Sequence, residues 1–160
     1  MSYREWTYNG YGVCIDDYLD KIPNEKVLDF VKKSKKVEDR FKELMEEIKE
    51  QDGLDLENEN DLDDAIVDAI DNYECETCLT GLGAILYDVM NDCEEGLRFN
   101  IVDDFDGNEY VLLLEGYPWQ MTKRELEMTP EKLDAIFKKY CDELIEGDYD
   151  IDYYEVCNGG

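Results

Sequence analysis

The chain has 160 residues, of which 43% are apolar, and a formal net charge of −27 from 43 acids and 16 bases. Its twelve Tyr and two Trp exclude a disordered acidic tail, which would be poor in aromatic residues, and predict a single folded domain over 1–160. A charge of this size repels nucleic acid and anionic membranes, and it attracts basic proteins and cations. Histidine is absent, which excludes histidine-based catalytic triads and most catalytic zinc sites.

The amino-terminal third predicts a β-hairpin followed by two helices. Residues 3–15 are rich in β-forming side chains around Asn9-Gly10, which is a strong turn signal. Amphipathic patterns then predict helices over about 24–36 and 37–50. In the second helix the exposed acids and bases interleave, which is the ordinary pattern of a solvated helix.

The most unusual stretch is 51–76, which contains eleven carboxylates and neither lysine nor arginine. Its second half predicts a helix over 61–73 with an apolar face directed inward. The opposite face carries a row of aspartates that recur at helical spacing: Asp61, Asp64, Asp68 and Asp71.

The acidic excess is regional. Residues 51–122 carry twenty acids and one base, Arg98, whereas the segments before and after have net charges of only −2 and −6. A surface adapted to high salt would be acidic throughout, and an ordinary soluble face would mix both signs. This regional excess favours a specific role for the acidic row.

The rest of the chain completes an α+β pattern. The expected elements are a central apolar helix over 75–92, strands over 98–103 and 109–115 around Asp106-Gly107, a helix beginning at Pro130 and a strand over 149–156. Together these elements predict an antiparallel sheet built from two β-hairpins and a carboxyl-terminal strand, with about five helices packed mainly on one side.

No motif predicts catalysis, a cofactor or a metal. Cys75-x-x-Cys78 has zinc-like spacing, but a second such pair is missing, so free thiols in a reducing cytoplasm are expected, with zinc or redox chemistry as weaker alternatives. Asp106-Gly107 fails as a calcium loop, because Val102 and Leu113 occupy the positions that need acids. No phosphate-binding loop or apolar run of membrane-spanning length is present.

Two short blocks carry a family resemblance. They are Pro118-Trp119-Gln120-Met121 and Asn158-Gly159-Gly160, and the opening EWTYNGYGVC accompanies them. With these blocks the chain resembles small uncharacterised proteins carried by mobile genetic elements of gut bacteria, in which an acid often precedes the Asn-Gly-Gly, where this chain has Cys157. The resemblance implies plasmids, phage or conjugative elements as the setting. It implies no activity and no catalytic residues.

These observations predict a cytoplasmic, non-enzymatic inhibitor that mimics nucleic acid without binding it or a membrane. Its carboxylates would occlude the basic groove of a nucleic-acid-binding protein, such as a CRISPR nuclease or a restriction enzyme. The alternatives are an interaction or regulatory module that binds through a tyrosine-rich surface, and a divalent-cation-binding protein. The residues expected to bind the partner are Asp55, Glu57, Glu59, Asp61, Asp63, Asp64, Asp68, Asp71, Glu74 and Glu76.

Overall fold

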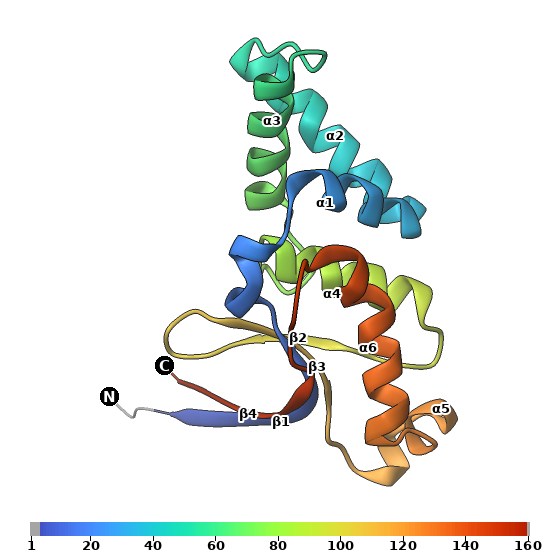
Figure 1. The fold of residues 1–160 in the computed structure, drawn as a ribbon. Coiled ribbons are helices and arrows are strands. Elements are labelled where there is room, and N and C mark those ends of the chain that lie inside the picture. The colour runs from blue at the N-terminus through green and yellow to red at the C-terminus, as the bar shows by residue number, and fades with distance from the viewer. Residues whose placement is uncertain (1–3, 160) are drawn as a thin grey trace.

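The fold is α+β, as predicted. A computed structural model describes residues 4–159 and contains a four-stranded antiparallel sheet with helices stacked mainly on one side (Figure 1). The strand order across the sheet is β2-β3-β1-β4. The strands are β1 (Glu5–Cys14), β2 (Asn100–Asp103), β3 (Glu109–Leu114) and β4 (Asp152–Gly159).

The helices form two layers above the sheet. Helices α4 and α6 contact the strands, and α1, α2 and α3 lie beyond them, farther from the sheet (Figure 1). The short helix α5, which the sequence patterns did not predict, lies beside the start of α6. The bounds are α1 (Asn24–Phe30), α2 (Lys35–Asp52), α3 (Glu59–Asn72), α4 (Leu82–Cys93), α5 (Lys123–Leu126) and α6 (Pro130–Leu144), with 3-10 turns at Ile15–Lys21, Val31–Lys33 and Pro118–Gln120.

The predicted amino-terminal hairpin is wrong. Asn9 and Gly10 lie inside β1, which pairs with β3 on one side and with β4 on the other. Gly10 is needed there for close approach and not for a turn, because a Cβ atom at this position would lie 2.6 Å from the carbonyl oxygen of Leu113. At Gly12 the corresponding distance to the carbonyl oxygen of Val111 is 2.0 Å. The partners of β1 are therefore two distant strands, β3 and β4.

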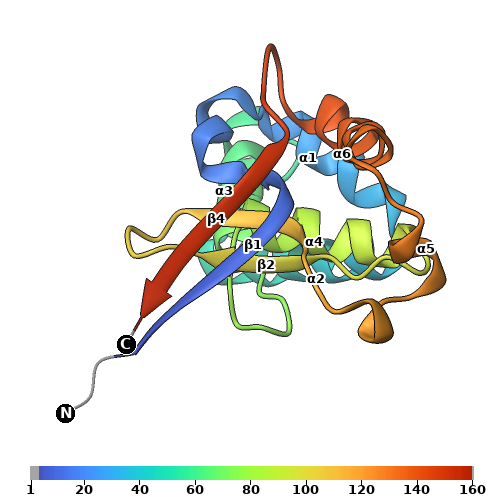
Figure 2. The same ribbon diagram turned by 90° about the horizontal axis from the view of Figure 1, so that it is seen from below.

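The sheet curls so that its two edge strands meet. Strands β1 and β4 cross β2 and β3 diagonally (Figure 2), and the Asn158 side chain on β4 donates a hydrogen bond to the backbone carbonyl of Asp103 on β2 at 2.8 Å. A small apolar cluster of Val102, Leu112 and Val156 lies on the face of the sheet opposite the main core. The curled sheet thus has apolar packing on both faces.

Helix α4 begins at Leu82, later than the predicted residue 75. Before it the chain turns back on itself, with Glu74 and Thr80 in an isolated antiparallel bridge. Cys78 and Gly81 have φ angles of 67° and 99°, which an α-helix cannot accommodate. The β2–β3 hairpin is confirmed, and so is the helix that begins at Pro130.

The main core lies between the sheet and the helices and continues between the two helical layers. Phe30, Phe41, Ile66, Phe137 and Tyr140 are among its largest fully buried side chains. None of the helices within residues 4–159 combines the length and the apolar composition that crossing a membrane requires.

Candidate functional site

The candidate site is built on the helical pair α2–α3. Ser34 caps α2, since its hydroxyl accepts a hydrogen bond from the Val37 amide at 3.3 Å, and Gly53 ends the helix in the left-handed conformation. Asn58 caps α3 by accepting from the amides of Asn60 and Asp61. These caps fix where each helix begins and hold the connecting loop at the end of the pair far from the sheet (Figure 1).

Two of the aspartates predicted to bind the partner also order this loop. The Asp61 carboxylate accepts a hydrogen bond from the Asp55 amide at 2.9 Å, and the Asp55 carboxylate accepts one from the Glu57 amide at 3.1 Å. Because these bonds satisfy backbone donors near the start of α3, they fix the positions of the acids relative to the helix.

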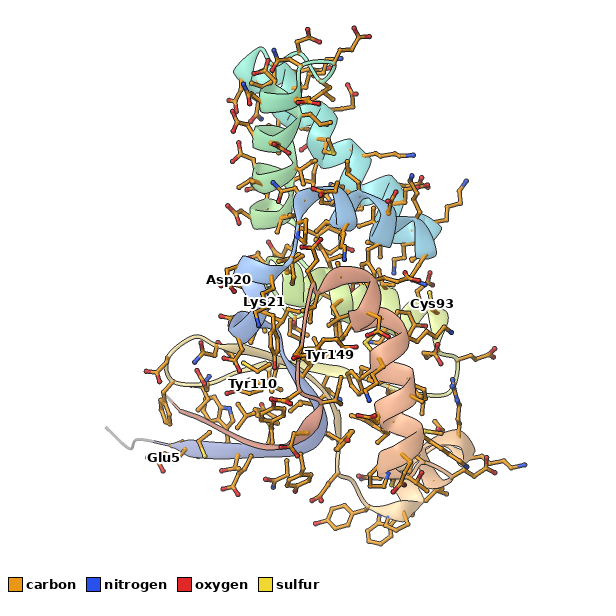
Figure 3. All side chains as sticks on the ribbon, viewed as in Figure 1. Glu5, Asp20, Lys21, Cys93, Tyr110 and Tyr149 are labelled. Carbon is orange, nitrogen blue, oxygen red and sulfur yellow. The ribbon has the colours of Figure 1, made fainter. Side chains whose placement is uncertain are left out.

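Helix α3 separates its apolar and acidic faces as predicted. Ala65, Ile66, Ala69 and Ile70 are buried against the core. On the other face Asp63, Asp64 and Asp71 are exposed, whereas Asp61 and Asp68 are half-buried at its margins. In Figure 3 oxygen-tipped side chains line the outer side of α3 and the loop above it.

Eight of the ten predicted residues share this region, which we call the α3 acidic face. Within residues 4–159 none of the eight lies within ion-pair distance of a lysine or arginine. The neighbouring helix α2 differs, because its Lys42 pairs with Glu38 and its Arg40 with Glu43. The members of the α3 acidic face are Asp55, Glu57, Glu59, Asp61, Asp63, Asp64, Asp68 and Asp71.

Glu74 and Glu76 do not belong to the α3 acidic face. They follow α3 at the end nearer the sheet and line a hollow of about 790 Å³ that also contains bases, among them Lys36, Arg40 and Arg98. The Glu76 carboxylate accepts a hydrogen bond from the Tyr87 hydroxyl at 3.2 Å. These two acids therefore lie in a site of mixed charge.

The other carboxylates of this hollow have partners within the protein. Tyr73 donates to Asp88 at 2.6 Å, and Ser34 donates to Asp92 at 2.6 Å. Burial raises the pKa of Asp88 above its usual value, although the hydrogen bond from Tyr73 and the charge of Lys36 act in the opposite direction. This part of the surface links α2, α3 and α4 and has a clear structural role.

The two cysteines with zinc-like spacing do not form a cluster with other ligands. Cys75 is buried and its sulfur contacts the Thr77 hydroxyl, whereas Cys78 is exposed. A hydrogen bond with Glu74 and the charge of that carboxylate raise the pKa of the Cys78 thiol. No group of three or more Cys, Asp or Glu side chains in the described residues is arranged to hold a metal ion.

Sequence reasoning missed two buried carboxylates that fix α5. Glu125 accepts hydrogen bonds from Arg98, and Glu94 pairs with Arg124 at 2.7 Å and with Lys139 at 3.3 Å. Arg98 is the one base within 51–122. Because it pairs with Glu125, it does not neutralise the α3 acidic face. These pairings have no local signature, because their partners lie 27 to 45 residues apart.

The described surface also carries an exposed pair of stacked aromatic rings, Tyr117 and Trp119. Trp119 belongs to the Pro118–Met121 block that carries the family resemblance, and Tyr117 directly precedes that block. Comparison of the chain with protein-family models, with curated proteins and with solved structures gives no match.

Proposed function

We propose that the α3 acidic face binds the basic groove of a nucleic-acid-binding protein in place of nucleic acid, and that the protein acts as a non-enzymatic inhibitor. The observation that supports this function most directly is that the eight carboxylates lack ion-pair partners within residues 4–159, whereas two acids of α2, Glu38 and Glu43, pair with bases of the same helix. Unpaired acids on one face produce a negative field that attracts and orients a basic partner.

The spacing of the acids is compatible with mimicry. Residues three or four apart on a helix are separated by about 4.5–6 Å along its axis. Duplex DNA carries one charge per ~3.4 Å on each strand, so the two spacings agree within a factor of two. An arginine fork that holds a phosphate pairs equally with a carboxylate, and this gives the same partner surface two possible ligands.

The position of the face also suits a groove. Figure 1 shows α2 and α3 extending away from the sheet, with the acidic loop at the far end. A protruding helix can enter a concave binding site that a flat surface could not reach. A CRISPR nuclease or a restriction enzyme is the partner proposed here, because the chain resembles proteins of mobile elements, which encounter such nucleases.

The test is a binding measurement with purified CRISPR and restriction nucleases, with and without competing duplex DNA. The variant Asp63→Asn/Asp64→Asn/Asp71→Asn changes three exposed acids of the α3 acidic face. Binding should weaken at least tenfold, because each lost charge-assisted hydrogen bond contributes about 1.5–3 kcal/mol. Competing DNA should displace the wild-type protein.

A matched control removes the same charge elsewhere. Three exposed acids lie elsewhere: Glu127 directly follows α5, Glu131 lies on α6 and Glu155 lies on β4. Changing all three to Gln alters the net charge equally. This control should bind the nuclease as the wild type does. Equal weakening by both triple variants would show that overall charge, and not the α3 acidic face, determines binding. Full binding in the presence of excess DNA would also contradict mimicry.

A further inference from the structure

Two large aromatic side chains are exposed beside each other at the end of the molecule opposite the α2–α3 loop. Trp119 is 77% exposed and Tyr117 is 62% exposed. Their rings are stacked, with centroids 4.7 Å apart and planes 8° from parallel. Exposed aromatic surface that is concentrated in one place is typical of a binding site.

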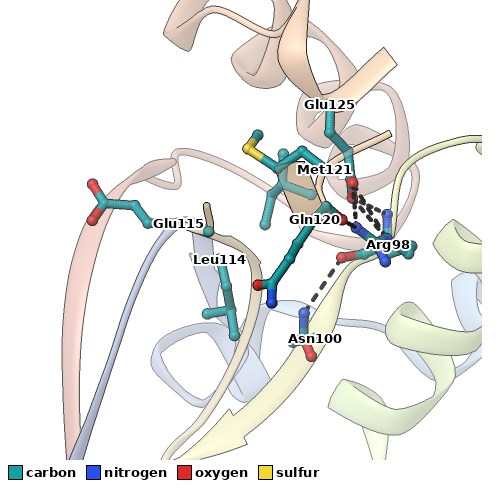
Figure 4. A pocket seen from close by; sticks show the side chains of 9 residues that line it. Arg98, Asn100, Leu114, Glu115, Gln120, Met121 and Glu125 are labelled. Carbon is teal, nitrogen blue, oxygen red and sulfur yellow. Dashed lines mark hydrogen bonds and ion pairs between the residues drawn. The ribbon is translucent and has the colours of Figure 1, made fainter. Parts of the chain in front are cut away.

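The segment that carries the rings is held firmly. Arg98 donates to the backbone carbonyl of Gln120 at 2.6 Å and pairs with the buried Glu125 at 2.7 Å (Figure 4). Glu125 also completes a capping box with Thr122, whose hydroxyl donates to the carbonyl of Gly96. A side chain fixed before binding loses less conformational entropy when a partner arrives. The exposed rings are therefore preorganised.

The geometry of the stack decides which ligand fits. The contact between the two rings leaves no gap for a proline ring, and it excludes an aromatic cage around a methylated amine. Only the outer faces of the rings are free. A planar group can add a third layer there, and the guanidinium of arginine is planar, cationic and well suited to the indole face.

Charge selects arginine over a nucleic-acid base, which is also planar. The protein carries a net charge of −27, which repels a polyanion. Glu115, two residues before Tyr117, is exposed, and within residues 4–159 its carboxylate has no ion pair. Figure 4 shows that carboxylate pointing away from the Arg98–Glu125 pair. It contacts the Tyr153 hydroxyl, which does not neutralise its charge, so it can attract a basic partner.

Space for the residues next to such an arginine lies on both sides of the segment. One hollow of about 600 Å³ is lined by Leu114, Met121 and Gln120, among others. A second, of about 370 Å³, is lined by Tyr8, Leu114 and Tyr117, among others. The two share Leu114, Glu115 and Gly116, so they flank one ridge of the chain and offer apolar contacts to a peptide that crosses it.

From these observations we infer that the Tyr117–Trp119 stack binds an arginine side chain of a partner protein, which lies flat on the indole of Trp119 while its neighbours occupy the adjoining hollows. This contact shares no residue with the α3 acidic face. It needs only a partner with an exposed arginine, so it holds or fails independently of nucleic-acid mimicry.

The test is an NMR titration with the blocked tripeptide acetyl-Gly-Arg-Gly-amide, observing the indole N–H signals. The Trp119 signal should shift and saturate, whereas Trp6, which is 43% exposed on β1, is the internal control and should not move. The lysine tripeptide keeps the charge but lacks the planar guanidinium that stacks on the indole, so it should bind roughly two- to fivefold more weakly. Trp119→Ala should abolish the response in the amides of Glu115 and Gly116.

Two further probes separate the competing explanations. A citrulline tripeptide keeps the planar shape without the charge, and a short oligothymidylate supplies stacking bases. Equal binding of the citrulline peptide, or tighter binding of the oligonucleotide measured from the concentration dependence of the Trp119 signal, would overturn the inference. An unmoved Trp119 signal at the highest concentration of arginine peptide would also overturn it. The variant Asp63→Asn/Asp64→Asn/Asp71→Asn should leave the Trp119 response unchanged, whatever its effect on nuclease binding.

Discussion

Asn158 on β4 donates to the backbone carbonyl of Asp103 on β2 at 2.8 Å, and this bond connects the two edge strands of the sheet. The same amide group also reaches the Asp103 carboxylate at 3.2 Å. No backbone hydrogen bonds join β2 to β4, since β3 and β1 lie between them. The side chain of Asn158 therefore contributes directly to the curl of the sheet.

Removing this link should lower stability. Asn158→Ala deletes the donor and leaves the Asp103 carbonyl without it, so the free energy of unfolding should fall by about 1–2 kcal/mol. Urea denaturation measures the change. Asn100→Ala is the control, because Asn100 lies on β2 but makes only a 3.4 Å contact with the Arg98 carbonyl. If both variants lost the same stability, the edge-to-edge bond would have no special role.

Glu109 should make stability fall as the pH rises. Burial raises the pKa of this carboxyl to about 7, with further contributions from the charges of Asp16 and Asp103. One of its oxygens, Oε2, is buried and has no hydrogen-bond partner. Because the pKa in the unfolded chain is about 4.3, the folded state holds the proton more tightly, and folding becomes less favourable between these two values.

Glu109→Gln removes this penalty. After allowance for partial exposure, the variant should be more stable than the wild type by about 1–2 kcal/mol near pH 8 and equally stable near pH 4. Chemical denaturation at the two pH values provides the measurement. Glu155→Gln, at an exposed position on β4, controls for loss of one charge. A stabilisation that is the same at both pH values would show that titration of Glu109 is not its cause.

Local sequence signals predicted one hairpin correctly and misplaced the other. Asn9-Gly10 and Asp106-Gly107 are equally good turn signals, yet only the second forms a turn, where Gly107 has a φ of 82°. At Gly10 the glycine permits close approach of β3. That requirement arises from a strand a hundred residues away, so no reading of residues 3–15 could have found it.

Helical periodicity predicted the part of the candidate site that lies on α3, but not the part that follows this helix. The spacing along α3 placed Ile66 in the core and Asp64 on the surface, as observed. The separation of Glu74 and Glu76 from the other acids depends on the reversal at Cys78 and Gly81, where φ is positive. A cysteine such as Cys78 does not signal a positive φ angle in the sequence. The side chains that line the hollow with Glu74 and Glu76 come from α2 and α4, so the local sequence does not reveal them either.

The exposed acids of α3 should weaken the helix that carries them. Asp64 lies three residues from Asp61 and four from Asp68, and Asp71 lies three from Asp68. Like charges at these spacings repel, so Asp63→Asn/Asp64→Asn/Asp71→Asn should raise the free energy of unfolding by roughly 0.5–1 kcal/mol. By contrast, Ile66→Ala opens a cavity in the core and should lower it by about 2–5 kcal/mol. Thermal and urea unfolding test both changes. A triple variant that unfolds would show that these carboxylates are structural, in conflict with their exposure.

Arg98 should be needed for stability even though it is itself largely exposed. Its partner Glu125 has a side chain only 5% exposed. Burial opposes ionisation of Glu125, but hydrogen bonds from Arg98 and Thr122 outweigh it and hold the pKa of the carboxyl below its usual value. Arg98→Met leaves that carboxylate short of its charged donor, and the free energy of unfolding should fall.

The pH dependence of this loss provides the sharper test. A carboxyl whose folded pKa is depressed contributes stability above its unfolded pKa, and that contribution disappears as the pH falls through the folded value. The gap between wild type and Arg98→Met should therefore be largest at neutral pH and should close below about pH 4. Lys123→Met, at an exposed neighbour whose side chain makes no ion pair within residues 4–159, should show no such gap.

The Trp119 indole signal should also move in Arg98→Met, because Gln120 loses the hydrogen bond that fixes the aromatic segment. An unchanged Trp119 signal would mean that Arg98 does not fix the aromatic segment, and a gap that persists in acid would mean that the pair with Glu125 does not cause the loss of stability.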